Sequence, residues 1–297
     1  MTKKKFIILL IVILLVPILR YREEIFVYGQ QAVLSLDNIF YRSSSNLKHV
    51  SFFSDALQEE RNLYVYLPVG YFGKEKLSYP TLYLLHGVPG NELDWVDNGN
   101  IQQTLDRLIS EKQIKPVIVV IPDGTGPVVE DGQYVNADFV DQKMEDYIAV
   151  DLLKYVDEHY RTEAVGEKRA IGGNSSGAFG ALNIALHHPE LFRTVLALSG
   201  YSAPLQDDGS QLLSPEGILK NSILPEIAAL SSEKLPRVFL YYGSNDMYNF
   251  GPDVEAINLA LKAKKAVTEL AVNDGFHSWF SWLEITEPAL VFMDQQF

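Results

Sequence analysis

The chain has 297 residues, of which 47% are apolar, so it can bury the core of one large domain or two smaller ones. Its formal net charge is −13, from 25 basic and 38 acidic residues, which argues against a nucleic-acid partner because phosphates require clustered Lys and Arg. The absence of cysteine excludes disulfides, catalytic thiolates and cysteine metal sites.

The first element in chain order is a short apolar segment. Three lysines at residues 3–5 precede an uncharged apolar run at residues 6–19, a pattern typical of secretory signals. The end of this run, VPILRYREE (16–24), lacks the small residues of a cleavage site. We therefore expect residues 1–22 to form a hydrophobic helix that acts as an uncleaved signal anchor, with the lysines in the cytoplasm and the folded body outside the cell membrane. Because a full crossing takes about 20 residues, cleavage of a signal peptide followed by secretion is the alternative.

Residues 23–46 are of mixed composition and are interpreted as a tether to a folded body, residues 47–297. In this body, apolar runs alternate with helical patterns. The predicted strands are LYVYLP (63–68), TLYLLHG (81–87), PVIVVIPDG (116–124), KRAIGGN (168–174), FRTVLALSG (192–200), RVFLYYGSND (237–246) and VTELAVNDG (267–275). The predicted helices between them include IQQTLDRLISEKQ (101–113), MEDYIAVDLLKYVDEHY (144–160) and GPDVEAINLALKAKKA (251–266). This alternation predicts an α/β fold with a mostly parallel central sheet and helices on both faces, and residues 203–235 are expected to leave the sheet.

A glycine-rich segment, GGNSSG (172–177), lies between a predicted strand and the helical run SGAFGALNIALHH (176–188). It contains the pattern G-x-S-x-G with Ser175 at its centre. In this context the pattern predicts a nucleophile elbow, a cramped strand-to-helix turn on which two glycines leave room for the backbone to pass. A phosphate-binding turn is the rival interpretation, but no G-K-[ST] follows and no G-x-G-x-x-G is present.

A nucleophilic serine needs a base, which in the α/β-hydrolase order follows the serine and an acid. Three of the six histidines precede Ser175: His49, His86 and His159. Two others lie on the helix of the elbow itself, about 18 Å away at about 1.5 Å per residue: His187 and His188. His277, in DGFHSWFSWLE (274–284), is therefore the predicted base.

The predicted acid is Asp246, which follows the strand RVFLYYG (237–243) by a short turn. The other candidates are better explained as helix caps, solvated charges or neighbours too close to the base: Asp207, Asp208, Asp253, Glu255 and Asp274. An oxyanion hole requires two backbone N–H groups. We assign them to Ser176, directly after the nucleophile, and to Val88, in the loop after TLYLLHG, where His86 is expected to shape the loop without transferring a proton.

Several motifs together resemble an esterase family that includes esterase D, bacterial feruloyl and acetylxylan esterases, and mycolyltransferases. They are VYLPVGY (65–71), YLLHGVPGNELDW (83–95), VIPDG (120–124), MEDYIAVDLLKYVDEHYRT (144–162), GGNSSGAFGAL (172–182), YYGSNDMY (241–248) and GFHSWFSW (275–282). The resemblance runs from about residue 50 to the C-terminus. It implies an α/β-hydrolase fold without a metal or an organic cofactor, and it supports Ser175, Asp246 and His277 as a triad with the Val88 and Ser176 amides as oxyanion hole. Many relatives carry methionine at the position of Ser176.

The expected function is that of a serine carboxylester hydrolase acting outside the cytoplasmic membrane on a small-molecule or carbohydrate ester. Two alternatives are open. The first is an acyltransferase that passes the acyl group to a sugar or alcohol, which product analysis with an acceptor alcohol would distinguish from a hydrolase. The second is a non-catalytic surface-anchored protein of the same fold, which fluorophosphonate labelling would distinguish from an enzyme. Eight aromatic residues near the expected site suit a sugar or aryl ester, although core or rim packing explains each equally well: Trp95, Phe179, Tyr201, Tyr248, Phe250, Phe276, Trp279 and Trp282.

Overall fold

The computed structural model describes residue 43 and residues 45–73, 75–205 and 212–297. The hydrophobic helix expected at residues 1–22, most of the tether at residues 23–46, and the acids Asp207 and Asp208 lie outside the described residues. In the part of the chain that is described, no helix is both long and apolar enough to cross a membrane.

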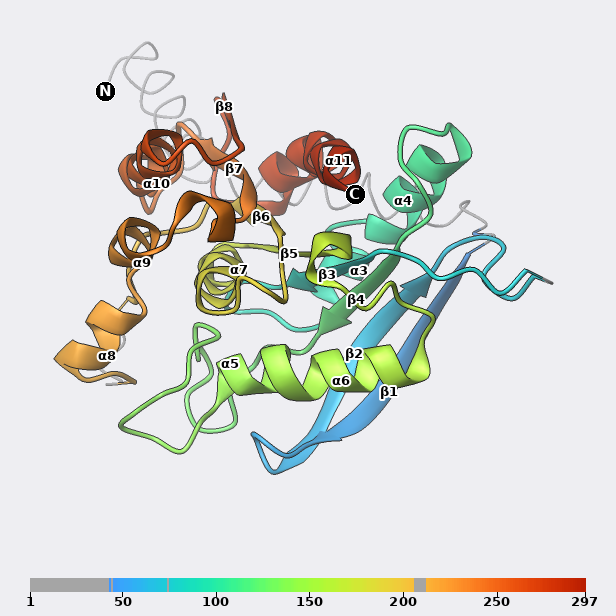
Figure 1. The fold of residues 1–297 in the computed structure, drawn as a ribbon, viewed down its shortest axis with the longest axis horizontal. Helices are drawn as coiled ribbons and strands as arrows, with labels where there is room; N and C mark the ends of the chain where they lie inside the picture. The colour runs from blue at the N-terminus through green and yellow to red at the C-terminus, as the bar shows by residue number, and fades with distance from the viewer. Residues whose placement is uncertain (1–42, 44, 74, 206–211) are drawn as a thin grey trace, which may run out of the picture. The chain divides into compact units, whose positions relative to one another are not determined.

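Eight strands form one sheet, in the order β1-β2-β4-β3-β5-β6-β7-β8 (Figure 1). β2 is antiparallel to both of its neighbours, β1 and β4, and every other pair is parallel. The expected mostly parallel sheet is therefore confirmed. The strands are β1 (Asn46–Ser54), β2 (Glu59–Leu67), β3 (Thr81–Leu85), β4 (Ile118–Pro122), β5 (Arg169–Asn174), β6 (Thr194–Leu198), β7 (Arg237–Gly243) and β8 (Thr268–Asn273).

All seven strands predicted from the sequence are present, but β1 was not predicted. β1 lies at the edge of the sheet and pairs only with β2, and most of its residues are exposed or half-buried. An edge strand of this kind carries polar residues such as Lys48 and His49, so it lacks the apolar run that identifies a buried strand.

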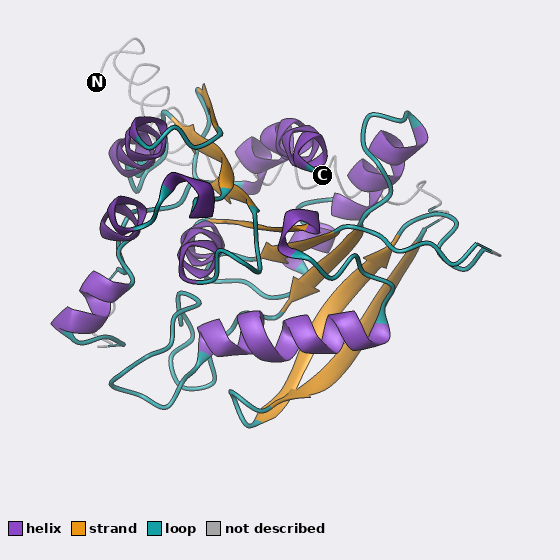
Figure 2. Ribbon diagram, viewed as in Figure 1, coloured by secondary structure: helices purple, strands orange, loops and turns teal. Residues whose placement is uncertain are grey.

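Helices cover both faces of the sheet, as Figure 2 shows. Side chains of β3 alternate between two hydrophobic cores: Tyr83 and Leu85 lie in one, Leu82 and Leu84 in the other. The first core is covered by a continuous helix made of α5 (Met144–Asp146), a π-helical turn (Tyr147–Leu152) and α6 (Leu153–His159), together with α7 (Ser176–His187), α9 (Ile223–Ala229) and α10 (Gly251–Ala263). The second core is covered by α3 (Asp94–Asp97), α4 (Ile101–Ser110) and α11 (Trp279–Gln296).

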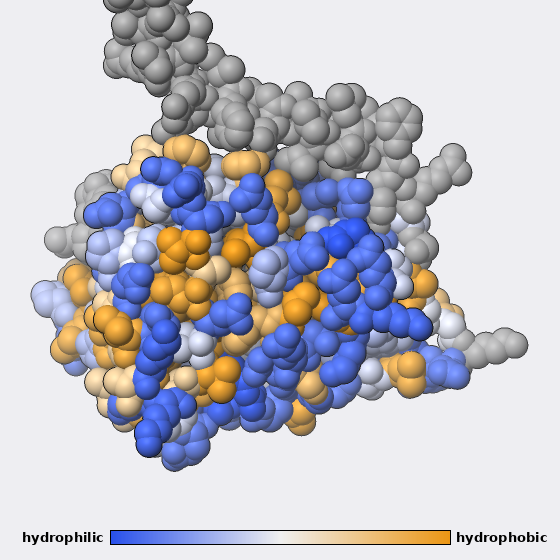
Figure 3. Space-filling model, turned by 90° about the horizontal axis from the view of Figure 1, so that it is seen from above, coloured by the Kyte–Doolittle hydropathy of each residue, from blue (hydrophilic) through white to orange (hydrophobic). Residues whose placement is uncertain are grey.

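The excursion expected at residues 203–235 contains α8 (Pro215–Lys220), α9 and a 3₁₀ turn (Ser232–Lys234) before the chain returns to β7. Of these, α9 supplies Ile223 and Ile227 to the first core, so part of the excursion is packed against the sheet layer. On the outer surface, hydrophobic residues are interspersed among hydrophilic ones over the face seen in Figure 3.

A buried carboxylate ties the start of the α5 helix to the end of α7. Glu145 accepts hydrogen bonds from His187 Nδ1 (3.0 Å) and His188 Nε2 (2.9 Å), while His187 Nε2 lies 3.0 Å from the carbonyl of Lys220 in α8. Burial by itself would raise the pKa of Glu145, but the two imidazoles outweigh it and lower that pKa to about 2. Burial also opposes the charged form of His187, yet the carboxylate raises the pKa of this imidazole above its ordinary value.

We expect Glu145→Gln to lower the free energy of unfolding by about 1–3 kcal/mol, because the amide oxygen can accept from only one imidazole and the NH2 group faces the other donor. A raised pKa for His187 means that its stabilising contribution is complete below the unfolded value of about 6.5 and is lost as the pH rises through the folded value. Urea unfolding of the unmodified protein and of Glu145→Gln should therefore show a larger difference in the free energy of unfolding near pH 6 than near pH 9. Equal differences at the two pH values would contradict this account of the cluster.

Candidate active site

The connections between the strands diverge at the boundary between β3 and β5. From β3 the chain runs outward to β4, and from the adjacent β5 it runs the opposite way to β6, so the loops after β3 and β5 diverge. In open α/β sheets, ligands bind at the carboxyl ends of the strands where the connections diverge in this way. Val88 follows β3 and Ser175 follows β5, so both lie at this point.

Ser175 occupies a sharp turn between β5 and α7. Its backbone has φ 54° and ψ −121°, a conformation that is unusual for a residue with a side chain. The Ser175 amide donates to the carbonyl of Leu198 at the end of β6 (2.9 Å), and the Ser175 carbonyl accepts from Ala178 and Phe179 in the first turn of α7. The turn that the G-x-S-x-G pattern predicts is therefore present, and it projects Ser175 at the end of the sheet.

Gly177 makes this turn possible because the first turn of α7 presses against the end of β3. A Cβ atom on Gly177 would overlap the carbonyl oxygens of Leu85 and His86, and one on Gly173 would also meet the Leu85 oxygen. Both glycines therefore serve close backbone approach between the elbow and the loop that carries Val88.

The structure brings together the three side chains predicted as a triad. His277 Nε2 lies 2.9 Å from Ser175 Oγ, and His277 Nδ1 lies 2.7 Å from Asp246 Oδ2. Asp246 is in the turn after β7, where its other carboxylate oxygen accepts from the amide of Tyr248 (2.9 Å). The Asp246 side chain is 1% exposed and the His277 side chain 8% exposed, so the contact between them is shielded from water.

The acids weighed against Asp246 have other partners. Asp253 accepts from the Ser202 amide, Asp274 from the Ser244 hydroxyl and Glu255 from the Tyr242 hydroxyl. The remaining histidines also contact other groups, among them His49 with Glu92 and His159 with the carbonyl of Tyr155. The geometry thus matches the predicted assignment, and the chemical roles of the three residues remain predictions.

Aromatic rings surround the His277 imidazole edge to face. The ring centroid of Tyr248 lies 4.7 Å away, that of Trp282 5.1 Å and that of Phe250 5.6 Å, with interplanar angles of 71–82°. Trp282 is itself fixed, because its Nε1 donates to Ser199 Oγ (3.1 Å). Trp282 packs edge to face on Trp279 (5.4 Å), which packs the same way on Trp95 (5.0 Å). These rings hold the orientation of the imidazole and exclude water from its sides.

A cavity of about 420 Å³ opens beside Ser175. Val88 and Ser176, the residues predicted to supply the oxyanion-hole amides, both line it. Ser176 is the first residue of α7, where backbone N–H groups have no acceptor within the helix. The Ser176 hydroxyl donates to Asp131 Oδ1 (2.7 Å). The hydroxyl is therefore engaged by Asp131, and the predicted oxyanion-hole role falls to the Ser176 amide alone. The other lining residues are Pro89, Glu130, Asp131, Gln133, Tyr201, Leu205, Tyr248 and Phe250.

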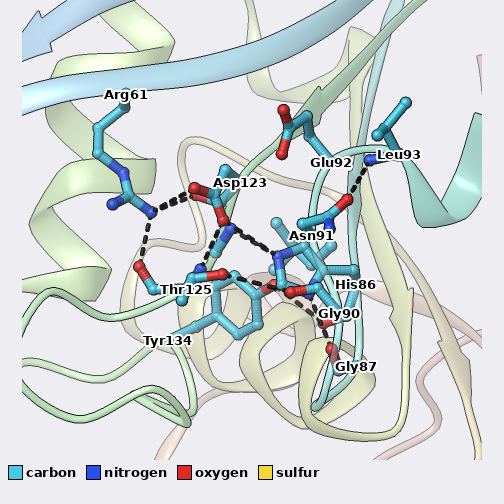
Figure 4. A network of polar contacts seen from close by, with 12 residues as sticks. Arg61, His86, Gly87, Gly90, Asn91, Glu92, Leu93, Asp123, Thr125 and Tyr134 are labelled. Carbon is cyan, nitrogen blue, oxygen red and sulfur yellow. Dashed lines mark hydrogen bonds and ion pairs between the residues drawn. The ribbon is translucent and has the colours of Figure 1, made fainter.

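His86 shapes the loop after β3 through hydrogen bonds to the backbone (Figure 4). Its Nε2 accepts from the amide of Gly124 (2.7 Å), so Nδ1 carries the proton and donates to the carbonyl of Gly87 (2.8 Å). The carbonyl of His86 accepts from the Tyr134 hydroxyl (2.9 Å), and Asp123 beside it is paired with Arg61 (3.3 Å). These bonds join the loops after β3 and β4 on the side of the elbow.

Sequence reasoning did not identify the residues of the loop after β4 that line the cavity, Glu130, Asp131 and Gln133. The only signal for them is their position after a parallel strand, where α/β proteins collect binding residues. Of the eight aromatic residues singled out, three line the cavity: Tyr201, Tyr248 and Phe250. In the part of the chain that the structure describes, no group of three or more His, Asp or Glu side chains is arranged to hold a metal ion.

Comparison with known proteins places this geometry in a family. A ferulic acid esterase structure superposes with a TM-score of 0.76 at 25% identity, over 86% of this chain and 100% of that one. An S-formylglutathione hydrolase from Agrobacterium tumefaciens superposes with a TM-score of 0.73 at 18% identity, over 86% of this chain and 97% of that one. These likenesses confirm the α/β-hydrolase fold.

Among curated sequences, an endo-1,4-beta-xylanase/feruloyl esterase of Xylanibacter ruminicola is 33% identical over 159 residues, and an uncharacterised protein of Corynebacterium glutamicum is 27% identical over 239 residues. The matches cover 52% and 75% of this chain, but they span only 22% and 54% of those two proteins. The family model described as "Putative esterase" matches residues 54–285, which is more than half of the chain. The chain therefore belongs to this esterase family of α/β-hydrolases.

Proposed function

We propose that the protein hydrolyses carboxylic esters outside the cytoplasmic membrane through an acyl-enzyme on Ser175. The observation that carries the proposal is the unbroken chain of contacts from Asp246 through His277 to Ser175, with distances of 2.7 and 2.9 Å, beside a cavity. A nucleophile, a base and an acid in this arrangement are the parts that acyl transfer requires.

In the proposed reaction, Ser175 Oγ attacks the ester carbonyl while His277 Nε2 takes the hydroxyl proton. The negative charge that develops on the carbonyl oxygen is stabilised by the Val88 and Ser176 amides and by the N-terminal end of α7. Collapse of the tetrahedral intermediate breaks the ester bond, and His277 returns its proton to the departing alcohol. A water molecule then attacks the carbonyl of the acyl-enzyme while His277 takes one of its protons. His277 returns this proton to Ser175 Oγ as the acyl bond breaks, which releases the acid and restores Ser175. Asp246 orients the imidazole and stabilises its charged form throughout.

For the substrate we propose an ester with an aromatic acyl group or a carbohydrate alcohol. The rings of Tyr201, Tyr248 and Phe250 line the cavity and provide flat apolar surface for such groups. The names of two relatives, a feruloyl esterase and a ferulic acid esterase, describe activities of the same kind.

Ser175→Ala should lower ester turnover by about 10³-fold or more, because it removes the nucleophile and leaves only binding and oxyanion contacts. The assay is hydrolysis of an aryl acetate by purified protein, with thermal unfolding to confirm an intact fold. Ser110→Ala, on the exposed end of α4, is the matched control and should keep full activity. Retention of a tenth of the activity by Ser175→Ala in a clean preparation would end the assignment.

Asp246→Asn should lower turnover by about 10²–10⁴-fold, since an amide cannot hold the His277 imidazole in the required tautomer or stabilise its charge. The control is Asp274→Asn, an exposed carboxylate three residues before His277 that pairs with Ser244. Steady-state kinetics of both variants decide the question. A small loss of turnover in Asp246→Asn together with a large loss in Asp253→Asn or Glu255→Gln would identify a different acid.

The proposed location rests on the N-terminal sequence alone. Lysines at residues 3–5 and the apolar run at residues 6–19 support a membrane anchor with the catalytic body outside. Deletion of residues 1–28 should then give a soluble protein of full activity, because the family match begins at residue 54. N-terminal sequencing of the native protein tests the anchor: an intact lysine cluster in the membrane fraction supports it, and a mature chain that starts near Gln30 would mean cleavage and secretion instead.

A further inference from the structure

We propose that Gln133 is a specificity-determining residue: it ties together two loops that line the cavity and thereby limits the size of the ester group that the cavity accepts. This inference rests on the proposed function of the site. It concerns the loop after β4 and the loop after β6, which both supply residues to the cavity lining.

The Gln133 amide pairs with the backbone of Leu205 as a neighbouring strand would. Its Nε2 donates to the Leu205 carbonyl (2.8 Å), and its Oε1 accepts from the Leu205 amide (2.7 Å). The same Oε1 also accepts from the Tyr201 hydroxyl (3.1 Å). Gln133 is only 5% exposed, so these bonds are shielded from water and are costly to leave unmade.

On its own side of the cavity, Gln133 is held in place by the neighbours of the nucleophile. Its backbone amide donates to Asp131 Oδ1 (3.1 Å), the oxygen that also accepts from the Ser176 hydroxyl (2.7 Å). The next residue, Tyr134, is buried and donates its hydroxyl to the His86 carbonyl (2.9 Å). The loop after β4 is thus bonded to the elbow and to the loop after β3, so the backbone of Gln133 is held in place.

In the loop after β6, the bridge holds an aromatic part of the cavity wall. Tyr201 stacks on Phe179 of α7 (4.7 Å, 12°) and contacts Phe250 (5.2 Å, 47°). Because Tyr201 and Leu205 both line the cavity and both bond to one amide, that amide sets how far this wall lies from Ser175. Release of the bridge would let the Leu205 backbone move outward, which enlarges the space beside the nucleophile.

The test compares Gln133→Met with Gln142→Met. Methionine keeps the length and approximate volume of glutamine but removes all the hydrogen bonds of the side chain, so a change in selectivity reports the bridge rather than lost volume. Gln142 is the matched control: it is fully buried in the same loop and bonds to the Val128 and Val129 backbone, but it does not line the cavity. The measurement is kcat/KM for p-nitrophenyl acetate, butyrate and octanoate, with Ser175→Ala activity subtracted.

Gln133→Met should raise the ratio of octanoate to acetate kcat/KM by about tenfold, the effect of one methylene group more or less in a binding pocket. Gln142→Met should leave the ratio unchanged. An unchanged ratio in Gln133→Met, or an equal rise in both variants, would overturn the inference. Tyr201→Phe removes one bond of the bridge with little change of volume and should raise the ratio to a smaller extent, so it decides the matter if Gln133→Met does not fold. Absence of Ser175-dependent turnover in the unmodified protein would instead refute the proposed function.

Discussion

The close approach of the elbow to the end of β3 is the constraint on which the rest of the site depends. Ser175 adopts a backbone conformation that costs free energy for a residue with a side chain, and its backbone hydrogen bonds to Leu198, Ala178 and Phe179 keep it there. Gly177 brings α7 against the carbonyls of Leu85 and His86, so the position of Ser175 and the course of the Val88 loop are fixed together. His277 and Asp246 then approach Ser175 from loops at the same edge of the sheet.

Buried strands, and the three side chains that meet at the end of the sheet, could be predicted from sequence because both are local or sequential signals. Seven strands were visible as apolar runs, and Ser175, Asp246 and His277 followed from one motif, a chain order and elimination. β1 could not be found this way, since an exposed edge strand such as Asn46–Ser54 needs no apolar run. The π-helical turn at Tyr147–Leu152 was equally invisible, because the sequence there has an ordinary helical pattern.

The walls of the cavity were beyond sequence reasoning for a different reason. The hydrogen bond from Ser176 to Asp131 joins residues 45 apart in the chain, and the bond from Gln133 to Leu205 joins residues 72 apart. No periodicity or motif marks either partner, and Asp131 and Gln133 lie in a stretch with few regular elements. Such contacts arise from the way the loops after β3, β4 and β6 pack together, so they can be identified only once the fold is known.

The cluster of indole rings beside His277 has a consequence for spectroscopy. The chain contains three tryptophans, and Trp95, Trp279 and Trp282 form one contiguous group that ends on the imidazole. The intrinsic tryptophan emission of the protein therefore originates beside His277. Since a charged imidazole quenches a neighbouring indole, this emission offers an optical test of the proposed proton transfer at His277 and reports a group that enters next to it.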